Sequence, residues 1–322
     1  MRRLALPLLL AVALPASSAQ VSSAQISSAQ ATRYAPYTVA ALAQSTFNGG
    51  PLQLVRVLER NPAFTRWLVN WKSDGTTQVG FMNIPAGPSK KPVVIVIHGY
   101  VNPRGYPTLG YTARYADALA RAGFVAVHPN LRGHGVSGGT PDGPYRVSYA
   151  IDVLSLLSSL RQSAGKGALS SVDASRIGLW GHSMGGGVAT RVMVLDKNVR
   201  AVVLYGAMSG DEAKNASQIY YVFSGRSRGI FELNTPKSWL QKISPSNAFA
   251  RVTAAVSIHH GTADNQVPPA WSVETCGKLR ALGKSVECFS YAGAPHLFTR
   301  GSSADALLRS RVEAFFRRTL GR

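Results

Sequence analysis

The chain has 322 residues, of which 45% are hydrophobic and 16% are charged, and its formal net charge is +20. This composition excludes a disordered chain, and the length favours one large α/β domain over two independent domains. The Lys and Arg residues are scattered, without a long basic run, so we expect a solvated cationic surface with weak association with anionic surfaces and no nucleic-acid partner.

The N-terminus has the features of an export signal. Arg2 and Arg3 precede an apolar stretch over residues 4–14, which is too short to span a membrane. We therefore expect residues 1–19 to be a signal peptide and the mature protein to be secreted or periplasmic. No other stretch approaches about 18 uninterrupted apolar residues, so we expect no transmembrane segment.

A Ser-Ser-Ala-Gln motif occurs three times over residues 17–30, beginning at the end of the expected signal. We expect a flexible Ser/Ala/Gln spacer over residues 20–35 and a single domain over residues 36–322. Small residues offer three alternative cleavage sites, after Ala19, Ala24 and Ala29.

The domain is expected to open with a helical extension over residues 36–62, followed by a β-hairpin. Two apolar runs, 64–71 and 78–84, flank Asp74-Gly75, a pair that favours a tight hairpin turn. The next run, 93–97, is an unbroken series of β-branched residues, typical of a strand that is buried on both faces.

From this point strands and helices alternate along the chain. The expected strands cover residues 93–97, 124–128, 177–180, 199–205, 254–259 and 285–291. The expected helices cover residues 111–122, 149–160, 188–195, 270–282 and 304–320. The alternation predicts an α/β fold with a mostly parallel central sheet and helices on both faces. Residues 206–250 interrupt it with an aromatic-rich insertion, for which a lid over the site and a structural excursion are equally favoured.

The motif Gly-His-Ser-Met-Gly around Ser183 lies between an apolar strand and an apolar helix. A serine at such a corner sits on a strained turn with its hydroxyl exposed. Serine needs a base to accept its proton, and the base needs a carboxylate to orient it. Asp264 and His296 each follow a later expected strand, so Ser183, Asp264 and His296 are expected to meet as catalytic residues. Their order is that of the α/β-hydrolase fold.

The other histidines have less demanding interpretations. We expect His98 to orient the loop that holds it, and His134 to serve a structural role or contact substrate. The histidines at strand ends are expected to be packing residues: His128, His259 and His260.

Two backbone N–H groups are expected to form an oxyanion hole, those of Met184, next to the serine, and Tyr100, after the flexible Gly99.

Cys276 and Cys288 fall on an expected helix and the following strand, and an even cysteine count in an exported protein favours a disulfide. The alternative is a pair of buried thiols. No His, Cys or Asp cluster has metal-ligand spacing and no cofactor motif is present, so we expect neither a metal nor a cofactor.

Across residues 73–320 these motifs resemble the catalytic domain of the prolyl oligopeptidase family. They include the His98-Gly99 loop, the Arg132-Gly133-His134-Gly135 loop, the serine motif, His260-Gly261-Thr262-Ala263-Asp264 and Gly293-Ala294-Pro295-His296. Larger members of that family carry a β-propeller, for which this chain has no room. The Ser-Met pair also resembles polyester hydrolases related to cutinase. The Asp and His segments resemble dienelactone hydrolases too, but these use a cysteine where this chain has Ser183.

The sequence thus predicts an exported serine hydrolase that cleaves esters or amides of small-molecule or peptide substrates, as a peptidase or an esterase. One alternative is an acyltransferase with the same three residues. Another is a non-catalytic binding protein on a hydrolase scaffold. No pattern in the sequence indicates an oligomeric state.

Overall fold

The computed structural model describes residues 23–321, so the expected signal peptide lies outside the described residues. Tyr37–Arg322 form one compact unit, and the described residues before Tyr37 belong to another. The latter hold helix α1 (Ser23–Tyr34), which lies within residues 20–35, where we expected a flexible spacer. Alanine and glutamine have high helix propensities, which gives this repeat a local reason to be helical.

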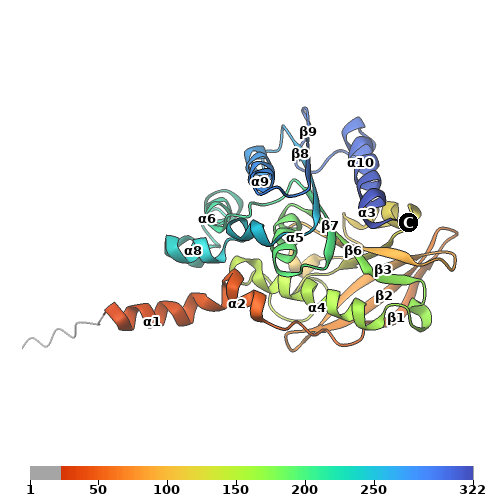
Figure 1. The fold of residues 1–322 in the computed structure, drawn as a ribbon, viewed down its shortest axis with the longest axis horizontal. Helices are drawn as coiled ribbons and strands as arrows, with labels where there is room; N and C mark the ends of the chain where they lie inside the picture. Colours follow the sequence, from red (N-terminus) through yellow and green to blue (C-terminus); the bar gives the residue numbers. More distant parts are fainter. Residues whose placement is uncertain (1–22, 322) are drawn as a thin grey trace, which may run out of the picture. The chain divides into compact units, whose positions relative to one another are not determined.

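The described part of the large unit is built on a single nine-stranded sheet in the order β1-β2-β3-β5-β4-β6-β7-β8-β9 (Figure 1). Strands β5 to β9, together with β4, run parallel, and β1 to β3 are antiparallel. The strands are β1 (Gln53–Arg60), β2 (Phe64–Ser73), β3 (Thr76–Pro85), β4 (Lys91–Ile97), β5 (Val125–Pro129), β6 (Val172–His182), β7 (Val199–Tyr205), β8 (Ala255–Gly261) and β9 (Val286–Tyr291). The prediction of a mostly parallel α/β sheet with an N-terminal antiparallel part is confirmed.

Helices pack on both faces of this sheet. Besides α1, the helices of the described residues are α2 (Val39–Gln44), α3 (Ala113–Arg121), α4 (Val147–Ser163), α5 (Met184–Leu195), α6 (Glu212–Ser217), α7 (Ile230–Leu233), α8 (Lys237–Ile243), α9 (Pro269–Ala281) and α10 (Ser303–Leu320). Those on the two faces are α4, α5 and α9 on one and α3 and α10 on the other. Short 3₁₀ segments cover Ala35–Tyr37, Pro103–Gly105, Pro144–Arg146, Gly167–Leu169 and Pro245–Arg251, and a π-helix covers Gln218–Phe223.

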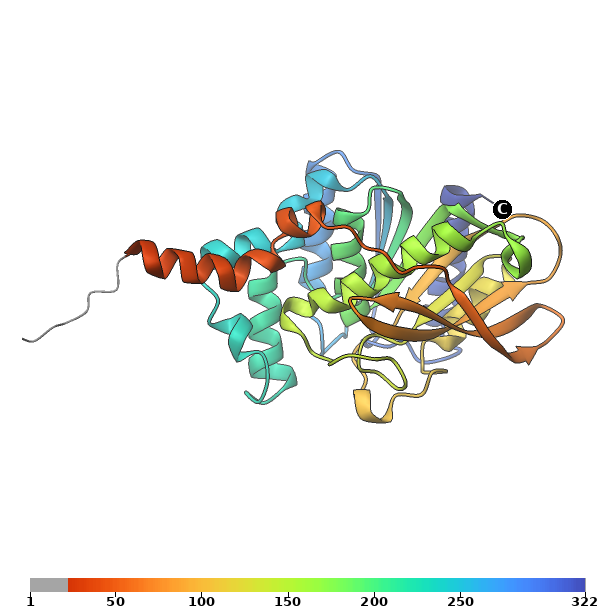
Figure 2. The same ribbon diagram turned by 90° about the horizontal axis from the view of Figure 1, so that it is seen from below.

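Side-chain alternation along β4 creates two hydrophobic cores, one on each face of the sheet. Val93 and Ile95 point into the core formed with α4, α5 and α9, whereas Val94 and Val96 point into the core formed with α3 and α10. All four side chains are completely buried, as expected for a parallel strand covered on both sides. Figure 2 shows the same layers from below.

The N-terminal hairpin is confirmed, and the segment before it differs from the prediction. Asp74 and Gly75 both have positive φ (47° and 74°), the backbone of a tight hairpin turn between β2 and β3. Residues 36–62 are helical only in part, because α2 is followed by strand β1, which pairs with β2. The β-branched Val55 and Val57 favour a strand, and pairing to β2 supplies the backbone hydrogen bonds.

The insertion over 206–250 folds into α6, the π-helix, α7 and α8, drawn in teal in Figures 1 and 2. Its base is tied to the domain by a buried ionic network. Arg191 of α5, itself 2% exposed, donates to Glu212 Oε1 at 2.6 Å and to the carbonyl oxygen of Ile243 at 2.9 Å. Arg146 pairs with the other carboxylate oxygen of Glu212. These contacts join the insertion to α5 and to the loop before α4.

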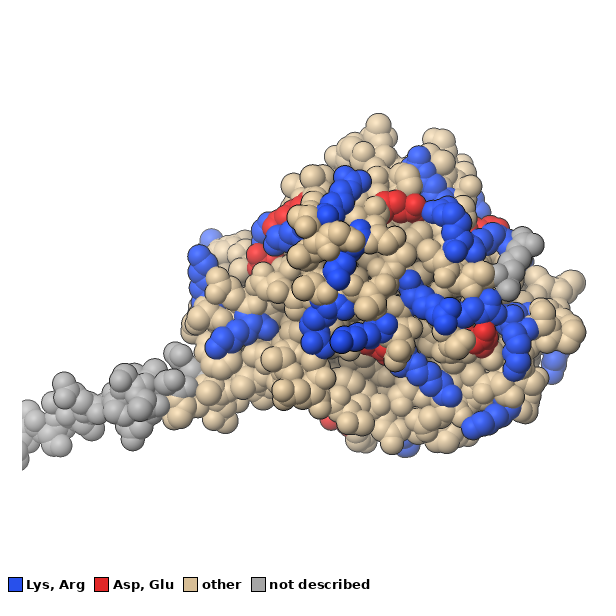
Figure 3. All heavy atoms as spheres, in the orientation of Figure 1, with Lys and Arg blue, Asp and Glu red and all other residues tan. Residues whose placement is uncertain are grey.

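Lysine and arginine side chains are spread over the face seen in Figure 3, with few acidic side chains between them. This face therefore carries dispersed positive charge. Among the described residues, no helix has both the length and the apolar character needed to cross a membrane.

Candidate active site

Ser183 lies at the corner between β6 and α5. Its backbone has φ 55° and ψ −120°, a left-handed conformation that is strained for a residue with a side chain. The corner is tight, because a Cβ added to Gly185 would lie 2.3 Å from the carbonyl oxygen of Ile97 on β4. Glycine at 185 therefore lets the start of α5 approach the end of β4, which positions Ser183 at the carboxyl edge of the sheet.

Asp264 and His296 lie in the loops after β8 and β9 and are hydrogen-bonded to each other. His296 Nδ1 donates to Asp264 Oδ2 over 2.6 Å, and both side chains are buried. The other carboxylate oxygen of Asp264 accepts the backbone N–H groups of Gln266 and Val267 at 2.8 and 2.9 Å. The carboxylate is therefore held in one orientation and leaves Nε2 of His296 as the free ring nitrogen.

His260, which we expected to be a packing residue, also contacts this carboxylate. Its Nε2 lies 2.9 Å from Asp264 Oδ2, and its Nδ1 lies 2.6 Å from Ser272 Oγ. Burial alone would raise the pKa of Asp264, but hydrogen bonds from His260, His296 and the Val267 N–H outweigh it. They hold the pKa well below its usual range, so Asp264 is ionised at neutral pH.

Ser183 and His296 line the same cavity, which has a volume of about 650 Å³. The structure thus brings all three predicted residues to one region, with Asp264 behind His296. No hydrogen bond joins the Ser183 hydroxyl to His296 in the described part of the chain, and such contacts often form only when substrate binds.

The loop after β4 passes close to the serine. A Cβ added to Gly99 would lie 2.5 Å from Tyr111 Oη and 3.0 Å from Ser183 Cβ, so glycine lets the loop pass this close without a clash. The next residue, Tyr100, lines the cavity, as does Met184 at the start of α5. In residues 23–321 no protein acceptor is hydrogen-bonded to the N–H of either Tyr100 or Met184.

The insertion provides much of the cavity wall. Arg228 crosses from it to the Tyr100 side chain, with a hydrogen bond of 2.8 Å to Tyr100 Oη and the guanidinium 4.6 Å from the ring centre. Arg228 also pairs with Asp142 at 3.1 Å. The insertion's apolar lining residues are Met208, Ile219, Phe223, Ile230 and Phe231. The insertion therefore supplies a large part of the apolar cavity wall, and Tyr100 and Tyr111 line the cavity as well.

Sequence reasoning missed Tyr111 and Arg228 as site residues. Tyr111 precedes α3 by two residues and reaches His182, next to the serine, at 2.9 Å. Neither residue belongs to a motif, and only the folded loops bring them to the cavity. His134 is completely buried and lies outside the cavity lining, which leaves it the structural role. His98 is buried too, with its Nδ1 2.7 Å from the carbonyl oxygen of its neighbour Gly99.

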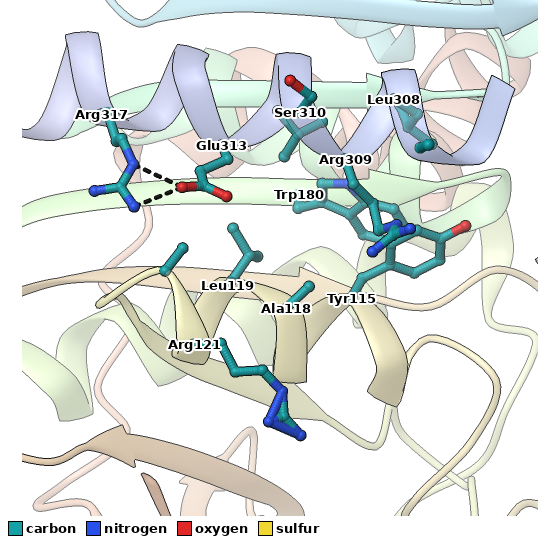
Figure 4. A pocket seen from close by; sticks show the side chains of 13 residues that line it. Tyr115, Ala118, Leu119, Arg121, Trp180, Leu308, Arg309, Ser310, Glu313 and Arg317 are labelled. Atoms are coloured by element: carbon teal, nitrogen blue, oxygen red, sulfur yellow. Dashed lines mark hydrogen bonds and ion pairs between the residues drawn. The ribbon is translucent and has the colours of Figure 1, made fainter. Parts of the chain in front are cut away.

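A second cavity, of about 440 Å³, lies between α3 and α10 (Figure 4). Trp180 and Tyr115 line it, but none of the residues discussed above as site residues does. Arg317 at its edge is paired with Glu313 at 2.5 Å, as the dashed lines in Figure 4 show. The cavity that contains Ser183 is therefore the candidate active site.

Cys276 on α9 and Cys288 on β9 are joined by a disulfide, with their Cα atoms 6.4 Å apart. The bond ties α9 to the last strand. Across the described residues, no group of three or more His, Cys, Asp or Glu side chains could hold a metal ion.

The sheet order, the strained serine after β6 and the loops after β8 and β9 together define an α/β-hydrolase fold. Residues 79–320 match the dienelactone hydrolase family, and the chain belongs to that family. Position 183 of this chain is a serine, as the sequence shows, whereas dienelactone hydrolases were noted above to use a cysteine there.

Solved structures with this fold include both peptidases and esterases. Acylaminoacyl peptidase from Pyrococcus horikoshii superposes with a TM-score of 0.64 at 22% identity, over 81% of this chain and 42% of that chain. Acetyl xylan esterase 1 from Thermoanaerobacterium superposes with a TM-score of 0.62 at 19% identity, over 88% and 92% of the two chains. At these identities the likeness establishes the fold alone.

A curated relative from Escherichia coli, an uncharacterised 31.7 kDa protein, is 28% identical over 120 residues. The match covers 37% of this chain and 38% of that protein. The chain therefore spans well under half the length of the curated relative that it matches.

Proposed function

We propose that this chain is an exported serine hydrolase that cleaves carboxylic esters or amides through an acyl-enzyme, with Ser183 as nucleophile, His296 as base and Asp264 as its carboxylate. The observation that carries this proposal is the 2.6 Å hydrogen bond from His296 Nδ1 to the ionised carboxylate of Asp264. His296 lines the same cavity as Ser183, whose backbone is strained. An imidazole held in that tautomer offers Nε2 as a proton acceptor.

In the proposed reaction, Ser183 Oγ attacks the substrate carbonyl carbon while its proton passes to His296 Nε2. The imidazolium is stabilised by Asp264. It then gives the proton to the leaving alcohol or amine as the C–O or C–N bond breaks. Water attacks the resulting acyl-serine, passes its proton to His296, and the acid is released as the proton returns to Ser183.

The negative oxygen of each tetrahedral intermediate is proposed to accept hydrogen bonds from the N–H groups of Tyr100 and Met184. Two features support this role: both residues line the cavity, and neither N–H is engaged by another described group. Met184 also begins α5, whose positive end favours an oxyanion. Such donors typically contribute two to three orders of magnitude each in rate.

The cavity favours substrates with a sizeable apolar acyl or leaving group. Its volume of about 650 Å³ lies within the range of small-molecule sites, and the insertion lines it largely with aliphatic and aromatic side chains. The resemblance to prolyl oligopeptidase catalytic domains makes peptides candidate substrates of this kind. The likeness to esterase folds makes esters candidates too. Arg228 of the insertion is hydrogen-bonded to Tyr100 of the loop after β4. We therefore also propose that residues 206–250 act as a lid, which opens when this contact breaks.

Export is proposed from the N-terminal pattern and is supported by the Cys276–Cys288 disulfide, which persists in oxidising compartments. Mass spectrometry of protein from the extracytoplasmic fraction should find a mature N-terminus after Ala19, Ala24 or Ala29. Accumulation of the full-length chain in the cytoplasm would argue against export.

The proposed activity can be tested with p-nitrophenyl esters of increasing acyl length and with aminoacyl and prolyl nitroanilides. We expect hydrolysis of at least one series, with kcat/KM rising from acetyl to larger apolar acyl groups, and its loss in Ser183→Ala. Transfer of the acyl group to an added alcohol in preference to water would instead indicate an acyltransferase. If folded wild-type protein were inactive on both series, that result would contradict the proposed hydrolase activity.

A further inference from the structure

A chain of hydrogen bonds runs beside Ser183 and connects two loops of the candidate site. The Gly99 N–H lies 2.6 Å from Tyr111 Oη, which in turn lies 2.9 Å from His182 Nδ1. At the other end, His182 Nε2 lies 3.1 Å from the carbonyl oxygen of His296. We call these four linked residues the relay.

The direction of every bond in the relay follows from its two ends. The His296 carbonyl can only accept, so His182 Nε2 carries a proton and donates it. In a neutral imidazole Nδ1 is then an acceptor, and it takes the hydroxyl proton of Tyr111. The Gly99 N–H can only donate, and the Tyr111 oxygen accepts it. Each hydrogen bond of the relay thereby has one donor and one acceptor, and a neutral His182 allows only this direction.

This arrangement requires His182 to stay neutral, and its surroundings favour that. His182 is 3% exposed, and its pKa is lowered to about 3, first by burial and then by the nearby His296. The titratable groups around it are Tyr111 from the loop before α3, Tyr205 from β7, His296 and, more distantly, Asp264 and His260. Of these, Asp264 favours protonation of His182, but burial outweighs it.

We propose that Tyr111 and His182 are positioning residues that set the peptide between Gly99 and Tyr100 and the main chain at His296 in a fixed relation to Ser183. The proposal rests on the function proposed above. Tyr111 holds the Gly99 N–H, so the following N–H, that of Tyr100, stays available for the oxyanion. His182 directly precedes the nucleophile and binds the main-chain carbonyl of the base, His296. The relay therefore positions both the oxyanion N–H of Tyr100 and the base relative to Ser183.

The expected effect is smaller than the loss of an oxyanion donor. Removing such a donor costs about two to three orders of magnitude, and a misplacement of about 1 Å costs up to about 100-fold. Tyr111→Phe removes one hydroxyl but keeps the ring. We expect kcat to fall by about 10- to 100-fold, with KM within about 2-fold, because the substrate's ground state does not use the oxyanion hole.

Tyr106 supplies the matched control. It is a buried tyrosine in the same loop, at 5% exposure, and its hydroxyl has no hydrogen-bond partner in the described structure. Tyr106→Phe should therefore leave kcat and KM within about 2-fold. Circular dichroism and thermal unfolding of both variants would verify that each is folded. A rise in KM with unchanged kcat in Tyr111→Phe would show that Tyr111 merely contacts substrate, and would overturn the positioning role.

A double-mutant cycle separates one connected relay from two independent contacts. Tyr111→Phe, His182→Gln and the double variant should show non-additive losses in kcat, because either change breaks the same chain. Fully additive losses would overturn the relay. Rates of Ser183 phosphonylation by a fluorophosphonate should follow the same pattern, since that reaction also develops charge in the oxyanion hole.

The relay can be tested independently of turnover by ¹⁵N NMR of the wild-type histidines, with His182 assigned through His182→Gln. At about pH 6, where an ordinary imidazole is mostly protonated, His182 should be neutral with its proton on Nε2. Tyr111→Phe should shift the Nδ1 resonance. A doubly protonated His182, or a proton on Nδ1, would overturn the relay even in an active enzyme. If the relay signature is present but wild-type protein neither turns over substrate nor labels at Ser183, the proposed function falls and the positioning role falls with it.

Discussion

Three buried histidines predict that the protein loses stability in mild acid. His128 and His259 are completely buried and His182 is nearly so. Burial is the largest cause that lowers the pKa of each to about 3. In the unfolded chain the same side chains titrate near pH 6.5. The unfolded state therefore binds more protons between these values, so stability rises with pH through this window and is lost as pH falls from about 6.5 toward 3.

The size of the effect follows from the difference in pKa. At about pH 5 each neutral imidazole costs the native state about 2 kcal/mol, because 1.5 pKa units at about 1.4 kcal/mol each separate this pH from the unfolded value. The three together cost about 6 kcal/mol, comparable with the whole stability of a typical domain. His98 is also completely buried, and because burial lowers its pKa as well, it adds to this loss. Asp264 does not offset this loss, because its lowered pKa contributes stability that is complete above the unfolded Asp value of about 4 and is lost only at lower pH.

Urea unfolding followed by far-UV circular dichroism at about pH 8, 7, 6 and 5 measures the loss. His259 lies outside the active-site cavity and is hydrogen-bonded to Ser257 Oγ and Tyr291 Oη at 2.9 and 2.8 Å. His259→Gln should lower stability at pH 8 but remove about 2 kcal/mol of the further loss between pH 8 and 5. A free energy of unfolding that stays constant over this range, or an unchanged slope in His259→Gln, would refute the reasoning.

Three further changes have outcomes that differ in kind. Cys276→Ser with Cys288→Ser opens a bond that spans 12 residues, and it should cost about 3 kcal/mol and lower Tm by several degrees; equal Tm values would contradict this. Arg228→Ala should lower kcat/KM by about 2- to 10-fold, with unfolding changed by no more than about 1 kcal/mol, whereas Arg226→Ala outside the cavity should leave kinetics unchanged. Gly185→Ala places a Cβ against a backbone oxygen and should cost about 1–3 kcal/mol together with most activity; a fully active, stable variant would show that the corner is looser than described.

The fold was largely predictable because its strands are short, apolar and separated by helical patterns. The run over 199–205 was placed to the residue, and Asp74-Gly75 marked the hairpin. Strand β1 was missed because a segment of eight residues with four apolar side chains fits a helix or a strand equally well, and its pairing with β2 decides the outcome. Helix α1, within the expected spacer, was not predicted because low-complexity composition does not reveal local helix formation.

The candidate site was predictable where a residue directly follows a strand, because strand ends of a parallel sheet converge at one edge. That logic located Ser183, Asp264 and His296, which the structure brings to one region. It could not locate Tyr111 or Arg228. Both lie in irregular segments, and their contacts depend on how loops that are distant in sequence pack together.

The most direct test of the central claim is mass-spectrometric mapping of a fluorophosphonate adduct, with its rate of formation measured in wild type, Asp264→Asn and His296→Gln. We predict a single adduct on Ser183 in wild type. Its formation should slow by about 10³- to 10⁴-fold in either variant, because the nucleophile loses its oriented base. No adduct, an adduct at another residue, or an undiminished rate in His296→Gln would contradict the account.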